Sequence, residues 1–409
     1  MSSSEGRTRR EILADAAMAA AAASVAGLAG CFPSVGGKWP SSACSDPDAG
    51  ANANAGTFPG VTPAVVEVQR EESVTIGTTA VIQPDVVATM LDAGLVALAN
   101  QVALFNAGAP AQGAGSDTAE AGAPGSGGGT DNPWKVLLPN YTDGLRIGLK
   151  INCLNPGVPT SPAIVNAIIA SLRDKLGVDP KNIIVWDRTM AELTKAGYSA
   201  DALAPTQLLA TWTRAFDNKT ETEASVTPAG LGYGDPICGA PRGILKGQPS
   251  NWPRLSRILT DKTDLTINCP VFKVHGQSGV TGAMKNIYGI IDNPGEYHPD
   301  STDADHLNNS LPKLYALPAI RKSISLTIVD ALIATTQKDT QYPQDAYPKR
   351  ILLGLDPVAL DSYALILLNQ IRAAFTLGKF GPVDPKLTVW LDNAVNAGLG
   401  RRDFSLVSV

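Results

Sequence analysis

The sequence predicts an α/β fold with a mostly parallel sheet flanked by helices. Apolar segments of strand length alternate with segments of helical period, and several predicted strands end in a polar residue beside a helix start. Apolar residues make up 44% of the chain and charged residues 17%, a balance that allows a large buried core. We expect residues 61–409 to form a single α/β domain.

The individual elements follow from periodicity and from their end signals. Pro84 at a first helical position, Gly177 after a helix, and the caps Asp356 and Asp384 mark helix boundaries. The predicted strands lie at 64–69, 145–152, 183–186, 265–269, 325–330 and 350–355. The predicted helices lie at 84–106, from Ser161-Pro162 to Gly177, after Thr189, at 203–217, from Pro357 and at 385–396. The strand, helix and strand between 145 and 186 form a βαβ unit, whose strands should be parallel.

Three stretches are predicted to lie outside the sheet. Residues 31–60 are rich in Ala, Asn, Ser and Pro and should form a flexible tether, and residues 108–132 contain Gly-Ser-Gly-Gly-Gly and should form a flexible loop insertion. Residues 200–252, with their Gly/Pro-rich part, are interpreted as an insertion or lid over the sheet edge.

The amino terminus carries an export signal. Thr8-Arg-Arg-Glu-Ile-Leu13, an alanine-rich stretch and Leu28-Ala-Gly-Cys31 together resemble a twin-arginine signal joined to a lipoprotein cleavage box. We expect residues 1–30 to be removed and Cys31 to carry the lipid, on the periplasmic side of the cell envelope. Phe32, in place of an acidic residue, favours the outer membrane over the inner. The alternatives are an ordinary alanine-rich helix or a single membrane anchor.

Charge and cysteine content exclude some partners and cofactors. The formal net charge is −5 and no basic run follows the signal, so nucleic acid is not an expected partner. Besides Cys31 the chain has Cys44, Cys153, Cys238 and Cys269, without a C-x-x-C pair, so no iron-sulfur cluster is expected. These four residues could form up to two disulfides or remain free thiols.

The main candidate site is the segment Lys273-Val-His-Gly-Gln-Ser-Gly-Val-Thr-Gly-Ala-Met-Lys-Asn286. Lys273 and His275 alternate on a predicted strand and should face the same side. The glycines, among them Gly279 and Gly282, can turn the backbone so that successive N–H groups face an anion. We therefore predict catalytic roles for Lys273, His275 and Lys285. We predict ligand contacts for Gly279, Thr281, Gly282 and Asn286.

Further candidates lie where predicted strands end. Lys150, Asn152 and Asp187 should meet at the carboxyl edge of the parallel sheet, where ligands bind in such folds. Asp356 and Asp361 lie at a helix start, Asp356 as its cap and Asp361 one turn further in. All five are predicted ligand contacts.

A divalent metal is an open alternative in the segment from Asn293 to His306. His298 and His306 could hold it together with neighbouring carboxylates, although their spacing matches no standard site. An acidic loop exposed to solvent would have the same composition. Apart from that metal, the cofactor is unknown from the sequence.

Several motifs, in this order, resemble the family known as domain of unknown function 362. They are Lys150-x-Asn152, Thr160-x-Pro162, Asp187, Asn268-x-Pro270-x-x-Lys273-x-His275, Thr281-Gly-Ala-x-Lys-Asn286-x-x-Gly289 and Gly354-x-Asp356-Pro-Val-Ala-Leu-Asp361. The resemblance spans roughly residues 64–409 and implies no general reaction. Many members carry a ferredoxin-like iron-sulfur module, and others are exported with twin-arginine signals. The cysteines of this sequence do not form the C-x-x-C-x-x-C run of that module, so we do not expect a built-in cluster.

Two functions of different class fit these residues. The first is a membrane-anchored enzyme in which Lys273, Lys285 and backbone amides hold a small anionic substrate and His275 moves a proton. The second is a non-catalytic lipoprotein that captures an anion or a metal.

Overall fold

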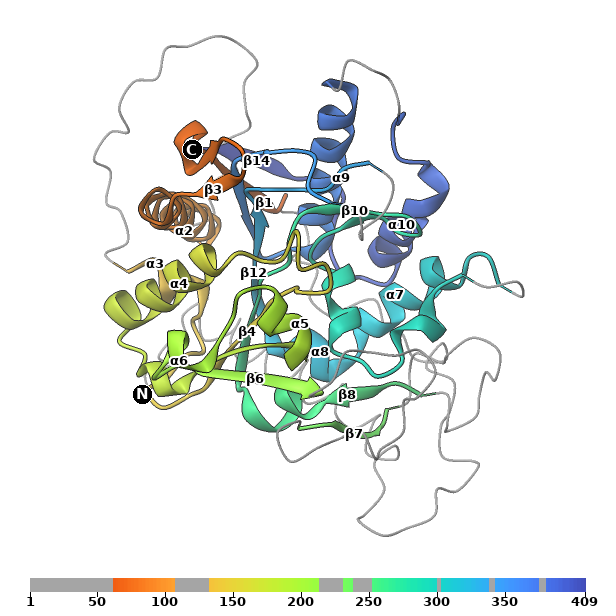
Figure 1. Cartoon of the computed structure of the whole chain (residues 1–409). Helices are drawn as coiled ribbons and strands as arrows, with labels where there is room; N and C mark the ends of the chain where they lie inside the picture. Colours follow the sequence, from red (N-terminus) through yellow and green to blue (C-terminus); the bar gives the residue numbers. More distant parts are fainter. Residues whose placement is uncertain are drawn as a thin grey trace, which may run out of the picture.

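The computed structural model describes residues 62–106, 132–212, 231–237, 252–299, 303–337, 343–374 and 380–409. A sheet forms its centre (Figure 1). It has eight strands in the order β14-β1-β13-β12-β9-β4-β5-β6. In that order the strands are Ser405–Ser408, Ala64–Gln69, Arg350–Gly354, Ile324–Ala331, Leu265–Asn268, Ile147–Lys150, Ile183–Thr189 and Gln207–Trp212. The predicted α/β class is therefore confirmed.

Seven of the eight strands share one direction. β13 alone is antiparallel, pairing with β1 on one side and with β12 on the other, and all other neighbours in the sheet are parallel. The carboxyl ends of β4, β5, β9 and β12 consequently meet at one edge, the place where ligands bind in open α/β sheets.

Two buried hydrophobic cores cover the two faces of the sheet. Side chains alternate along each strand, so Ile184 and Trp186 of β5 enter one core while Ile183 and Val185 enter the other. On the second face lie α2 (Pro84–Asn106), α3 (Pro133–Leu137), α4 (Pro162–Ser171), α5 (Met190–Lys195) and α6 (Ala200–Leu203). On the first lie α7 (His306–Ala316), α8 (Pro318–Ser323), α9 (Pro357–Ala374) and α10 (Val389–Asn396).

Short hairpins and single turns complete the described part of the chain. The hairpins are β2 (Val74–Ile76) with β3 (Ala80–Ile82), β7 (Tyr233–Pro236) with β8 (Arg254–Ser256), and β10 (Lys273–His275) with β11 (Gly279–Thr281). The 3-10 turns are Glu71–Ser73, Pro180–Asn182, Lys285–Gly289, Pro294–Tyr297 and Pro385–Thr388, and π-helical turns are Leu172–Leu176 and Ile258–Lys262.

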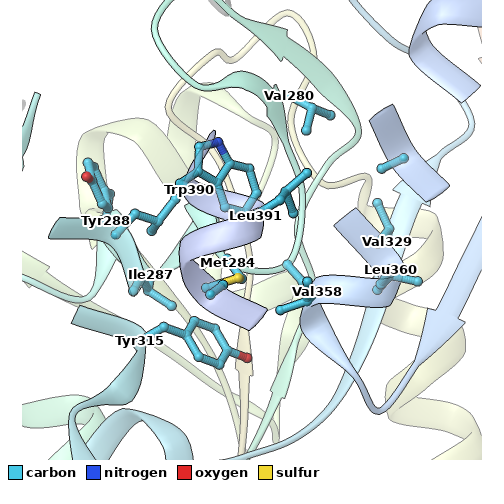
Figure 2. Close-up of a cluster of buried hydrophobic side chains, with 14 of the residues drawn as sticks. Val280, Met284, Ile287, Tyr288, Tyr315, Val329, Val358, Leu360, Trp390 and Leu391 are labelled. Carbon is cyan, nitrogen blue, oxygen red and sulfur yellow. The ribbon is translucent and has the colours of Figure 1, made fainter. Parts of the chain in front are cut away.

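The first core joins the segment after β11 to the helices around it. In Figure 2, Met284 and Ile287 lie between Tyr315 of α7, Val358 of α9 and the α10 residues Trp390 and Leu391. Because all of these side chains are buried, the neighbouring Lys285 and Asn286 are held on a rigid support.

Most predicted helix boundaries are confirmed. The Ser161 hydroxyl accepts from the Ile164 N–H, and Gly177 adopts a φ of +75° where the helix ends. Asp356 Oδ1 accepts from the N–H groups of Val358 and Ala359 at 2.9 Å each.

The helix predicted at 203–217 is wrong where the structure describes that segment. Residues Gln207–Trp212 form β6, the edge strand that pairs with β5, because in-register pairing with a buried neighbour outweighs weak helix propensity. The tether and the insertion at 108–132 lie outside the described residues, except Asn132, as do residues 1–61 and most of 213–251.

α2 is long and apolar enough to cross a membrane by length and composition. Its side chains Val87, Met90, Leu91 and Leu95 are buried in the core that α2 forms with the sheet. This packing is typical of a core helix in a globular domain.

Candidate functional site

A buried ion pair lies at the carboxyl ends of β4 and β5. Lys150 Nζ lies 2.8 Å from Asp187 Oδ1, and the two side chains are 1% and 5% exposed. The second carboxylate oxygen accepts from the Cys153 N–H at 2.7 Å, and the ammonium also donates to the Ile151 carbonyl. Each charge is therefore compensated within the fold, which gives this pair a structural role at the base of the site.

Gly289 makes room for that pair. A Cβ at position 289 would lie 2.7 Å from Lys150 Nζ and 3.0 Å from Asp187 Oδ1. Only glycine lets the backbone approach the ion pair this closely.

Three asparagines connect the pair to the segment after β11. Asn286 Oδ1 accepts from Asn152 Nδ2 at 3.0 Å, and Asn286 Nδ2 donates to Asn268 Oδ1 at 2.8 Å. Asn268 in turn donates to the Ala283 carbonyl. This network fixes the Asn152 amide so that its oxygen faces Lys273.

Lys273 is the least compensated charge described at this edge. Its side chain is 1% exposed, and its Nζ donates to Asn152 Oδ1 at 2.9 Å. No other described residue accepts a hydrogen bond from it. Burial lowers the pKa of the Lys273 ammonium to about 8, although Asp187 opposes this change. An ammonium has three donors, so a bound anion would complete its contacts.

The turn between β10 and β11 fixes the ring of His275. His275 Nδ1 accepts from the backbone N–H of Gln277 at 3.1 Å and of Ser278 at 3.2 Å. Burial, with Lys285 and His298 nearby, lowers the pKa of His275 well below its usual value. The neutral ring therefore carries its proton on Nε2 and can offer it as a hydrogen bond. Gly279, with a φ of +75°, closes the turn.

His298 stacks on His275 and contacts Lys285. The two imidazole centroids lie 5.5 Å apart at 9°. His298 Nδ1 lies 3.0 Å from the Pro294 carbonyl and must donate to it, so Nε2 accepts from Lys285 Nζ at 3.3 Å. Burial and Lys285 lower the pKa of His298 to about 3. Lys285 Nζ also lies 3.3 Å from the centroid of the Tyr288 ring, a cation-π contact.

The amides after Gly282 hold a carboxylate of the protein itself. Asp361 of α9 is fully buried, and its two oxygens accept from the N–H groups of Ala283 and Met284 at 2.5 and 2.9 Å. A Cβ at Gly282 would lie 2.0 Å from Asp361 Oδ1. We expected these amides to face an external anion; in the structure Asp361 occupies them. Burial raises the pKa of Asp361 to about 7, while the amides oppose this.

The remaining predicted residues lie in different places. Thr281 is buried beside Gly282, and its hydroxyl has no hydrogen-bond partner among the described residues. Asp356 caps α9 at the opposite edge of the sheet, so it does not join Lys273. His306 stacks on Tyr297 with centroids 6.0 Å apart, and its Nδ1 lies 3.6 Å from Asp303 Oδ2.

No group of three or more His, Cys, Asp or Glu side chains is arranged to hold a metal ion within the part of the chain that the structure describes. Both ring nitrogens of His298 already have hydrogen-bond partners. Residues 300–302 lie outside the described ranges, and metal binding near His298 and His306 stays a prediction.

Two described cysteines are free and buried, Cys153 and Cys269, and burial raises the pKa of both thiols. Cys44 and Cys238 lie outside the described residues.

Asn268 and Tyr288 belong to the site but were not among the predicted site residues. Asn268 ends β9 and Tyr288 lies three residues after Lys285, so their positions beside predicted residues were the available signal. This geometry defines the class of the protein: an α/β protein with a lysine–asparagine cluster at the carboxyl edge of its sheet.

Comparison with known proteins supports the family. Residues 245–365 match the family described as Domain of unknown function (DUF362), and the matched range includes the segment from Lys273 to Asp361. No curated protein matches the chain. A crystal structure of a protein from Thermotoga maritima is similar over 57% of this chain, with 14% identity and a TM-score of 0.32. The chain spans 56% of the length of that protein.

Proposed function

We propose that the protein is an exported lipoprotein, anchored through Cys31 to the periplasmic side of the cell envelope, that acts as an enzyme on a small anionic molecule. The twin-arginine pattern and the Leu28-Ala-Gly-Cys31 box support the address. The lysine–asparagine cluster of Lys273, Asn152 and Asn286 is the proposed binding site.

The observation that carries the proposal is the state of Lys273. Burying an ammonium group that donates to a single neutral amide oxygen costs free energy, unless an anion binds to it as well. The Nε2–H of His275 is a second donor on the same strand, since its Nδ1 is held by two backbone amides. A carboxylate or phosphate would accept from both groups.

Lys273 also favours catalysis over passive binding. With a pKa of about 8, the amine exchanges its proton close to neutral pH, as a general acid or base must. His275 serves in this proposal as a fixed donor, because protonation of Nδ1 would break two hydrogen bonds. This differs from the proton-moving role that the sequence alone had predicted for His275.

Non-catalytic capture of an anion is the second candidate. The observation that favours it is that His275 Nδ1 and both ring nitrogens of His298 are already engaged, so neither imidazole is set to take a proton from a ligand. A divalent metal bound near His298 and His306 would be compatible with both candidate functions.

The test begins with native mass spectrometry and elemental analysis of protein purified from the cell envelope, which identifies any anion or metal that copurifies. Isothermal titration calorimetry with inorganic phosphate and with malonate then compares the wild type with Lys273→Met. We expect Lys273→Met to weaken binding at least about tenfold, the usual effect of removing a charged hydrogen-bond donor. Lys195→Met, at an exposed position of α5, is the matched control. Equal affinities of the wild type and Lys273→Met for every anion tested would contradict the proposal.

Lys273→Arg separates the two candidates once a ligand is known. Arginine keeps the positive charge but does not release a proton near neutral pH. An enzyme should retain binding and lose turnover in this variant, whereas a capture protein shows no turnover of the ligand in either form.

A further inference from the structure

A cavity lies at the edge of the sheet opposite to Lys273. Its volume is about 280 Å³, near the lower end of the range for small-molecule sites. The first residues of β1, β12 and β14 border it, together with the last turns of α2 and the link from β13 to α9. Since β13 is antiparallel, its carboxyl end lies beside the amino ends of its neighbours.

The walls of this cavity are mainly apolar. The side chains that form them include Leu98, Val102, Leu104, Ile324, Leu355 and Leu399. Leu104 and Leu355 are 39% and 41% exposed, which places them toward solvent, while Leu98 is 1% exposed and lies deep in the fold. An alkyl chain would replace water along this lining.

One polar group that lines the cavity has no hydrogen-bond partner among the described residues. Tyr315, the penultimate residue of α7, is 5% exposed, and its hydroxyl makes no hydrogen bond with any residue the structure describes. Figure 2 shows its ring beneath Met284 and Ile287, with the hydroxyl pointing to the side on which Val358 lies. Because Tyr315 lines the cavity, its O–H can donate a hydrogen bond to a ligand bound there.

A positive charge stands beside that hydroxyl. Arg321 of α8 lines the cavity, interacts electrostatically with Tyr315, and donates from Nη2 to the Gly398 carbonyl at 3.0 Å. The carboxyl groups of Asp356 and Asp361 also interact electrostatically with Tyr315. The other charged lining residues are Arg401, paired with exposed Asp403 at 2.6 Å, and Asp356, whose carboxylate accepts from three backbone N–H groups. The lining therefore suits an anionic head group.

We propose that this cavity binds an amphipathic monocarboxylate, with its alkyl chain along Leu98 and Val102 and its carboxylate accepting hydrogen bonds from Tyr315 and Arg321. Arginine and a phenolic hydroxyl together match the two oxygens of a carboxylate. The site is separate from the lysine–asparagine cluster, and it does not depend on the function proposed there.

Isothermal titration calorimetry of the mature full-length chain with decanoate and with decanol tests this site. We expect saturable binding of one decanoate per chain and affinity for decanol weaker by about tenfold or more, because the alcohol lacks the charge that Arg321 attracts. Tyr315→Phe should weaken decanoate about tenfold, while Tyr141→Phe, outside the cavity, should not.

Two further variants protect the result from folding artefacts. Leu104→Trp should fill the mouth of the cavity and block decanoate, whereas Ile366→Trp, at the similarly exposed Ile366 of α9, should leave binding unchanged. The proposal is overturned by absence of saturable binding, by equal affinity for decanoate and decanol, or by decanoate affinity that Tyr315→Phe and Leu104→Trp leave unchanged.

Discussion

The buried pair Lys150–Asp187 allows a quantitative test of how the site is supported. Asp187→Asn leaves the Lys150 ammonium, 1% exposed, without its carboxylate. Breaking one side of such a pair costs about 3–5 kcal/mol, a large part of the ~5–15 kcal/mol that stabilises a typical domain. Lys150→Met leaves the carboxylate unpaired instead and should cost a similar amount.

The double variant, Lys150→Met with Asp187→Asn, gives the sharper result. With both charges removed, the amide oxygen of the new side chain at position 187 can still accept from the Cys153 N–H, as the Asp187 carboxylate does at 2.7 Å. We therefore expect a loss of only about 1–2 kcal/mol, well below the sum of the single changes.

Urea denaturation followed by circular dichroism measures each free energy of unfolding. Asp392→Asn serves as the control, because Asp392 pairs with Arg402 at the surface and should change stability by less than about 1 kcal/mol. Two results would contradict a buried and mutually compensated pair. The stability losses of the two single variants could add up in the double variant, or the loss of either single variant could be no larger than that of Asp392→Asn.

Three other predictions concern the site itself. Gly282→Ala should cost about 2–4 kcal/mol in urea denaturation, because its Cβ would meet Asp361 Oδ1 at 2.0 Å; Gly381→Ala, with open space around it, should be near neutral. Binding of phosphate should be strongest below pH 8 and decline as pH rises through about 8, where the Lys273 ammonium loses its proton; affinity independent of pH there would exclude this residue. The ¹⁵N chemical shifts of His298 should show a neutral ring protonated at Nδ1 down to pH ~5, since its pKa is about 3; an imidazolium signal would contradict the assigned hydrogen bonds.

Much of the fold could be predicted from local sequence signals. The strand at 64–69 and the helix at 84–106 have the predicted bounds, since apolar period and a proline at the first turn specify them locally. The direction of β13 could not be predicted, because a buried apolar run reads the same in a parallel and an antiparallel strand. β6 was missed because its pairing with β5 is a tertiary interaction.

The candidate site was predictable in its location and less so in its contacts. Polar residues that end parallel strands meet at one edge, and Lys150, Asn152, Asp187 and Lys273 do lie there. The sequence could not show that Asp361, distant along the chain, fills the amides after Gly282. Spacing alone does not reveal which donors of a glycine-rich turn are already used.

A crystal structure of the mature protein with its copurified or titrated anion tests the central claim most directly. We predict density for an anion within hydrogen-bond distance of Lys273 Nζ and His275 Nε2. An anion bound only elsewhere, or a protein carboxylate already in contact with Lys273, would contradict the assignment of this cluster as the binding site.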